Sequence, residues 1–269
     1  MNSILRPSLH LALVAGVLTS IVPDRARAAE ITFLCAAAIE PWMHDVIPKF
    51  EKASGHSVKS TFLVINDIAE HVRKGEVSDL VAVSPPLWEV LRREGKLDQD
   101  IRIAIAKVGY GVFVKKGAAR PDISSVDALK RALLNARSIA FFPLRPDGGR
   151  GPTGAYQVRL VEQVGISADI KQKIVESNRP RPGQVVSAPI FELVANGGAE
   201  IGVAMISEIL QAPGVDLVGP VPPELRDFIV FTTGVPTTAR EPTAAKALID
   251  FLISRDAASV LKSKGLEQP

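Results

Sequence analysis

Residues 30–64 have the sequence EITFLCAAAIEPWMHDVIPKFEKASGHSVKSTFLV, and this stretch indicates the fold class. It opens with an apolar run, residues 30–38, that is typical of a buried β-strand. Residues 40–54 space their apolar side chains as a helix does, and Gly55 follows them as a common helix stop. A second strand-like run covers residues 56–64. Strand, helix and strand in direct succession predict parallel strands covered by a helix.

The same alternation continues along the chain, so the sequence predicts an α/β fold. Two long β-rich stretches, residues 101–117 and 226–236, differ from the shorter strand-like runs. They bracket a fresh series of helices and strands between residues 124 and 205. Two α/β series joined by two long strands predict two lobes with a double crossover between them.

The first 28 residues have the layout of a cleavable secretory signal. A charged start precedes an apolar run over residues 11–23, and small residues follow at Ala26 and Ala28. The apolar run is shorter than the roughly 20 residues that a membrane-spanning helix needs. We therefore expect cleavage after Ala28 and a periplasmic location for the mature chain.

Charge and composition narrow the classes of partner. The formal net charge is +3, and it falls to +1 without residues 1–28, which hold three arginines and one aspartate. A nearly neutral chain lacks the basic footprint of a nucleic-acid-binding protein, so we expect no such partner. The single cysteine, Cys35, excludes an intrachain disulfide and is expected to be a small buried residue. No histidine pair has metal-ligand spacing, and the sequence predicts neither a metal site nor a cofactor.

A glycine-rich turn, RPDGGRGPTGAY at residues 145–156, is unusual before a helix-like segment. Three interpretations compete: a nucleotide cradle, a site for a smaller anion, and a surface turn without a ligand. Residues 149–154 match G-x-G-x-x-G, but the preceding strand ends too early and Pro152 stiffens the turn, so the nucleotide interpretation is weak.

The anion interpretation requires less of this turn. A helix that begins near Thr153 presents unpaired N–H groups and the positive end of its dipole. Gly154 permits a close approach to the backbone, and Arg145 or Arg150 could add a charge-assisted hydrogen bond.

Two carboxylates, Asp67 and Glu208, lie near predicted strand-to-helix junctions, where a group for proton transfer could sit. The plainer interpretation makes Asp67 a helix cap and places Glu208 on a solvated face.

Four segments together resemble a known family. They are ITFLCAAAIEPW…PKFEKASG, FLVINDIAEHVRKGEVSDLVAVS, GPTGAYQVRLVEQVG and AAKALIDFLISRDAASVLKSKG. In this order they resemble the periplasmic molybdate-binding-protein-like family, the type II substrate-binding proteins of ABC transporters, which also has aconitate-isomerase-like members. The resemblance implies a periplasmic-binding-protein type II fold with a two-strand hinge. Lobe I would contain residues 29–107 and 228–269, and lobe II would contain residues 108–227.

The resemblance also implies which residues bind the ligand. In that family, backbone N–H groups and hydroxyls converge on an oxyanion. Here Ala38 stands where the family has a serine, and Met205 replaces a tyrosine. These departures make molybdate less suitable, whereas planar arginine side chains suit a carboxylate. The expected ligand-binding residues are Ala37, Ala38, Asn66, Arg145, Arg150, Thr153, Gly154, Ser187 and Met205.

Two functions follow from these expectations and stay open at this point. The first is a monomeric, non-enzymatic receptor that captures a small organic carboxylate or an oxyanion such as molybdate for an ABC permease. The alternative is an isomerase of an unsaturated tricarboxylic acid, similar to aconitate isomerase. That chemistry would need a base, for which Asp67 and Glu208 are the candidates.

Overall fold

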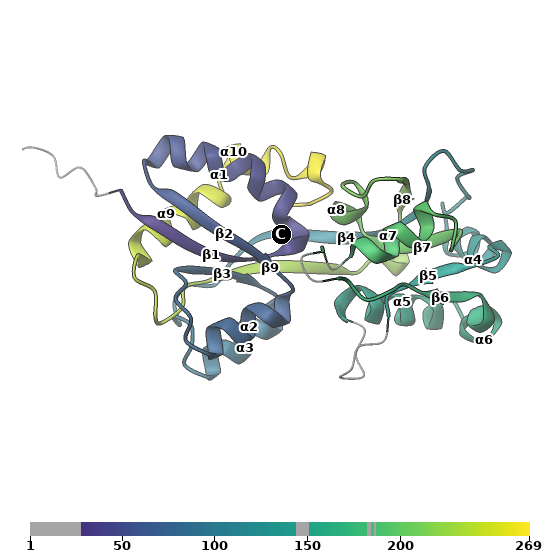
Figure 1. Ribbon diagram of the computed structural model, residues 1–269, viewed down its shortest axis with the longest axis horizontal. Coiled ribbons are helices and arrows are strands. Elements are labelled where there is room, and N and C mark those ends of the chain that lie inside the picture. Colours follow the sequence, from purple (N-terminus) through teal and green to yellow (C-terminus); the bar gives the residue numbers. More distant parts are fainter. Residues whose placement is uncertain (1–27, 144–150, 182–183, 186) are drawn as a thin grey trace, which may run out of the picture.

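The computed structural model describes residues 28–143, 151–181, 184–185 and 187–269 (Figure 1). These residues form a mixed α/β fold with a nine-stranded sheet. The strands are β1 (Glu30–Ala36), β2 (Ser57–Leu63), β3 (Leu80–Val83), β4 (Ile103–Lys115), β5 (Ile139–Phe141), β6 (Ile174–Glu176), β7 (Ile201–Met205), β8 (Val215–Pro220) and β9 (Phe228–Gly234).

The helices follow the strands in alternation, as the sequence predicts. The α-helices are α1 (Glu40–Ser54), α2 (Ile65–Arg73), α3 (Pro85–Arg93), α4 (Val126–Asn135), α5 (Gly151–Gln163), α6 (Ser167–Ile170), α7 (Ala188–Ala195), α8 (Ile206–Ile209), α9 (Pro242–Leu252) and α10 (Arg255–Ala258). Short 3-10 turns are η1 (Ala37–Ile39), η2 (Lys171–Lys173), η3 (Pro223–Leu225) and η4 (Lys262–Lys264).

The sheet has the strand order β2-β1-β3-β9-β4-β7-β5-β6, with β8 paired to β4. At one end, β1 pairs in parallel with β2 and β3. Helices α1, α9 and α10 cover one face of this end, and α2 and α3 cover the other (Figure 1). The opposite end contains β5 to β8 with α4 to α8, so the molecule has two halves (Figure 1).

Two long strands connect these halves. Residues 103–109 of β4 pair with β9, and from Tyr110 onward β4 pairs with β7 and β8 instead. The predicted two-strand connection is therefore present. The lobe boundaries at residues 107 and 227 stay predictions, although the change of partner along β4 falls close to the first of them.

The C-terminal segment returns to the first half through specific contacts. The buried carboxylate of Asp79 accepts hydrogen bonds from the backbone N–H groups of Thr32, Arg240 and Glu241, at 2.8, 2.8 and 2.9 Å. The indole N–H of the buried Trp42 donates to the carbonyl of Ala257 at 2.9 Å. These bonds hold β1, α1, α9 and α10 together and thereby fix the first half as one packed unit.

The core confirms the expectation for Cys35, which is fully buried, and burial raises the pKa of its thiol. Gly55 ends α1 in the left-handed conformation with φ 77°, as the helix-stop pattern predicts. Strands β6 and β8 and the short helix α8 were not predicted from the sequence. No helix in the described ranges is both long enough and apolar enough to cross a membrane.

Candidate ligand-binding cleft

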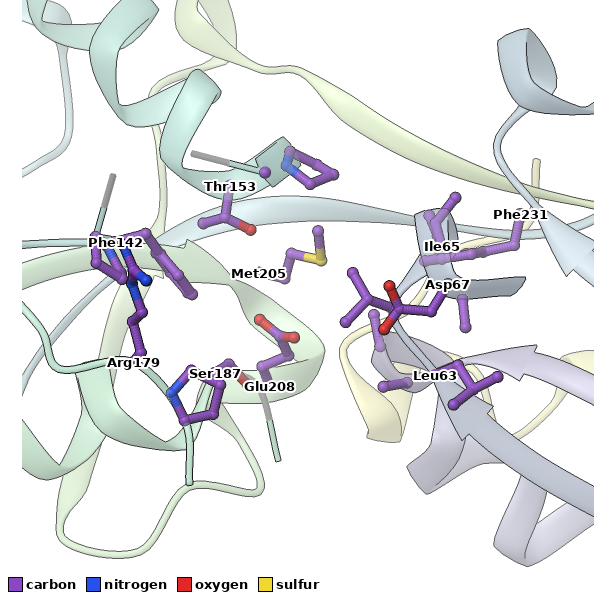
Figure 2. Close-up of a pocket in the computed structure, with 18 residues that line it drawn as sticks. Leu63, Ile65, Asp67, Phe142, Thr153, Arg179, Ser187, Met205, Glu208 and Phe231 are labelled. Carbon is purple, nitrogen blue, oxygen red and sulfur yellow. The ribbon is translucent and has the colours of Figure 1, made fainter. Parts of the chain in front are cut away.

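A cavity of about 410 Å³ lies between the two halves. Its lining comes from the ends of β1 and β2 on one side and from α5, α8 and the segment before α7 on the other. Figure 2 shows Ile65 and Asp67 facing Thr153, Met205 and Glu208 across this space. The carboxyl ends of strands in open α/β sheets are the usual place for a ligand, because helix starts gather there.

The first half contributes two chain reversals to the cavity. Strand β1 ends at Ala36 and continues into η1, and Ala37 and Ala38 line the cavity. Strand β2 ends at Leu63 and α2 begins at Ile65, preceded by Val64, which offers no side-chain cap. The first N–H groups of α2 therefore lack an intrahelical partner where the cavity begins.

The second half contributes the start of α5 and the residue before α7. Helix α5 begins at Gly151, whose φ of 69° lies in the left-handed region that only glycine adopts readily. Thr153 and Ser187 are both buried polar residues, with 6% and 3% exposure, and both line the cavity. Their N–H groups and hydroxyls are suited to hold a negatively charged oxygen.

The structure brings most of the sequence-predicted site residues together. Seven of them line the cavity, namely Ala37, Ala38, Asp67, Thr153, Ser187, Met205 and Glu208. Asn66 is exposed and Gly154 is buried in the first turn of α5, and neither lines it. Arg145 and Arg150 lie outside the described residues.

Sequence reasoning missed several residues of the lining. Arg179, in the loop after β6, reaches the cavity and adds a cation to its second side (Figure 2). The prolines and arginines of residues 178–183 were a signal, but the short strand before them was not predicted. Leu63, Phe142 and Phe231 give the cavity largely apolar walls.

Glu208 has the most perturbed environment among the predicted site residues. Burial raises its pKa to about 7, and only an interaction with the Ser187 hydroxyl opposes this shift. Its carboxylate oxygen Oε2 is shielded from solvent and has no hydrogen-bond partner within the described ranges. Glu208 is thus half-buried with one shielded carboxylate oxygen, which differs from the expected position on a solvated face. A carboxyl group with a pKa near neutrality can give or take a proton at physiological pH.

Asp67 occupies the first turn of α2, and Figure 2 shows its carboxylate directed into the cavity. The N-cap position of α2 is occupied by Val64 and not by Asp67. Within the described part of the chain, no group of three or more His, Cys, Asp or Glu side chains is placed to hold a metal ion.

Comparison with known proteins identifies the family of this chain. Residues 31–267 match the model of a family described as bacterial extracellular solute-binding protein. The chain belongs to this family, and its two-halved α/β architecture is the type II periplasmic-binding-protein fold.

Individual relatives extend over almost the whole chain. Aconitate isomerase from a Pseudomonas species is 26% identical over 242 residues, which cover 88% of this chain and 87% of the relative. The molybdate-binding protein of Azotobacter vinelandii is 27% identical over 269 residues, covering 96% of each. The solved structure of a periplasmic molybdate-binding protein from Azotobacter vinelandii superposes with a TM-score of 0.68 at 18% identity, covering 89% of this chain and 99% of that one.

Proposed function

We propose that this solute-binding protein captures a small organic acid in the cavity between its two halves and delivers it to an ABC permease. Residues 1–28 direct export to the periplasm, residues 29–107 with 228–269 form one lobe, and residues 108–227 form the other. The protein acts as a monomer. One observation carries the proposal: anion-binding groups from both halves converge on a cavity whose walls are mostly apolar.

The polar part of the cavity suits a carboxylate. The starts of α2 and α5 offer backbone N–H groups at the positive ends of two helix dipoles, and Ser187 adds a hydroxyl. Arg179 can grip two oxygens of one carboxylate in a bidentate pair. Arg145 and Arg150, from the glycine-rich turn of residues 145–156, remain predicted to contribute further charge-assisted hydrogen bonds to the ligand.

The apolar part of the cavity favours an organic acid over molybdate. A compact tetrahedral oxyanion would leave the side chains of Leu63, Met205 and Phe231 facing water or empty space. A ligand with a hydrocarbon body covers them and gains roughly 25 cal/mol for each Å² of apolar surface buried. The cavity volume of about 410 Å³ lies within the usual range for small-molecule sites.

Capture follows from the position of the cavity between the halves. A ligand that touches both sides stabilises the arrangement in which they are close, and β4 and β9 are the strands about which such closure would occur. The molybdate-binding relatives support the transport role, although their ligand is a compact oxyanion.

The test is a calorimetric and thermal-shift screen of the mature protein against molybdate, sulfate, succinate, citrate and trans-aconitate. We expect a tricarboxylate or dicarboxylate to bind with micromolar affinity or better and to raise the unfolding temperature. Molybdate as the sole ligand would contradict the choice of an organic acid. Absence of binding by every anion would contradict anion capture itself.

A second function is favoured by Glu208 and by the aconitate isomerase relative. An isomerase that moves a double bond in an unsaturated tricarboxylic acid must remove a proton from one carbon and return it to another. Glu208 can perform both transfers, because a carboxyl group with a pKa of about 7 exists in both states near neutrality. The proton abstracted from the substrate stays on Glu208 until its return, so no other reactant is needed.

This activity is tested by incubating the protein with cis-aconitate or trans-aconitate in D₂O and following both isomers by NMR. Conversion of one isomer into the other, lost in E208Q but retained in E192Q, would establish the isomerase. Binding without conversion over a day would leave the receptor as the function.

A further inference from the structure

Glu208 lies where two cavities meet. Besides the ligand-binding cavity, a second cavity of about 390 Å³ opens between the start of α1 and helices α7 and α8. The two cavities share four residues: Ala37, Ala38, Ser187 and Glu208. Among these four residues Glu208 has the only ionisable side chain, so its charge state affects both spaces.

The charged groups around Glu208 are mostly acidic or already paired. Asp67 faces it across the first cavity, where Arg179 also lies (Figure 2). Across the second cavity, Glu40 is bonded to His44 at 3.2 Å.

Further groups come from the elements that pack near α8. Glu192 of α7 accepts a hydrogen bond from Gln184 at 2.7 Å and pairs with Arg181 at 3.6 Å. Tyr110 of β4 carries a hydroxyl that also lacks a hydrogen-bond partner among the described residues, and burial, followed by the charges of Asp227 and Glu208, raises its pKa. No described cation forms an ion pair with Glu208.

A shielded carboxylate without a cation is costly, and it lowers that cost by holding a proton. Ser187 interacts with the carboxyl group, whereas Oε2 has no partner in the described part of the chain. Glu208 lines the ligand-binding cavity, so a proton on its carboxyl group would be a donor at the boundary of that cavity. A ligand carboxylate is an acceptor of the kind that such a donor needs, and a charge-assisted O–H···O bond is among the strong ones.

We propose that Glu208 is a ligand-binding residue that holds a proton in the complex and donates it in a hydrogen bond to a carboxylate of the bound acid. The anion and one proton are thus taken up together whenever Glu208 is ionised beforehand. The inference rests on the proposed capture of an anion and adds the chemical basis of its pH dependence. No covalent bond forms or breaks, because the proton stays on Glu208 or is shared with the ligand oxygen.

The sign of the pH dependence follows from this pairing. An ionised Glu208 would face the ligand carboxylate as a like charge, so only the protonated form binds well. For a pKa of about 7 the affinity falls by roughly 25-fold between pH 6.5 and pH 8.5. Glutamine at this position donates an N–H at every pH, so E208Q should bind with an affinity that does not follow this curve.

The experiment is calorimetric titration of trans-aconitate into wild type, E208Q and E192Q between pH 6.5 and pH 8.5. Titrations at pH 8 in HEPES and in Tris, which differ in ionisation enthalpy, give the number of protons taken up. We expect wild type and E192Q to take up close to one proton on binding, and E208Q to take up close to none. Because E208Q lacks the carboxyl group, its value also measures any proton that trans-aconitate itself takes up. E192Q is the matched control, because Glu192 lines only the second cavity.

Each outcome decides between the two proposals. Binding with the same proton uptake in wild type and E208Q overturns the role of Glu208 and leaves anion capture intact. Binding of neither trans-aconitate nor molybdate overturns anion capture, and the role of Glu208 fails with it. If E208Q does not fold, the carboxyl ¹³C shift of Glu208 in wild type decides: a group that titrates near pH 4.5 in both the free and the bound protein overturns the inference.

Discussion

Replacement of Glu208 by glutamine should stabilise the unliganded protein at neutral and alkaline pH. Burial raises the pKa of the folded-state carboxyl from its ordinary value of 4.5 to about 7. Between these two values the folded protein binds more protons than the unfolded chain, so the free energy of unfolding falls as pH rises. The variant carries no titrating group at this position and escapes that loss.

The size of the effect follows from the same two values. The pKa difference lowers the free energy of unfolding of wild type by about 0.8 kcal/mol at pH 5 and by about 3.3 kcal/mol at pH 8. The free energy of unfolding of E208Q relative to wild type should therefore increase by roughly 2.5 kcal/mol over this range. Any constant difference in packing between the carboxyl and the amide cancels in this comparison.

The measurement is urea unfolding of wild type, E208Q and E192Q at several pH values between 5 and 8, without any ligand. E192Q should follow wild type, because Glu192 is about half exposed and paired on the surface. Parallel profiles for E208Q and wild type would refute the reasoning, since they would mean that Glu208 titrates alike in the folded and unfolded chains. That result would also remove the physical basis for its proton in the complex.

Three further changes test the remaining parts of the structure. R179A should weaken trans-aconitate binding by at least tenfold, the loss of a charge-assisted pair, whereas R181A should not; equal titration isotherms for both variants would contradict this assignment. T153V removes the hydroxyl of a buried residue at nearly constant shape and should weaken the same binding several-fold, with an unfolding temperature within about two degrees of wild type. D79A leaves three backbone N–H groups without their acceptor and should lower the free energy of unfolding by at least about 3 kcal/mol in urea, without changing the ligand preference.

The fold was largely predictable because the spacing of apolar residues and the residues that end helices and strands agree along this chain. The strand β1, the helix α1 and its stop at Gly55 lie within two residues of the expected positions. Strand β6 has three residues and α8 has four, too few for a periodic pattern. Strand β8 was missed because its sequence, VDLVGP, mixes an acid, a glycine and a proline with three apolar residues.

The site was predictable only where a helix start defines it. Thr153 was expected from the helix start near it, and Ser187 was expected from the family resemblance; the two residues lie in the first turn of α5 and just before α7. The start of α2 lies at Ile65, before Asn66, and each residue of a helix rotates the side chain by about 100°. Asp67 therefore faces the cavity while Asn66 faces solvent, a distinction that depends on one residue of register.

The choice between a molybdate receptor and an organic-acid site depends on groups that the helix starts do not supply. Uncharged N–H donors hold any small anion, so the starts of α2 and α5 alone cannot distinguish a carboxylate from an oxyanion. The apolar walls favour a ligand with a hydrocarbon body, and Arg179 favours a ligand with a planar pair of oxygens. Glu208 adds a requirement of its own, because a shielded carboxyl group at the wall repels every anion unless one proton lies between them.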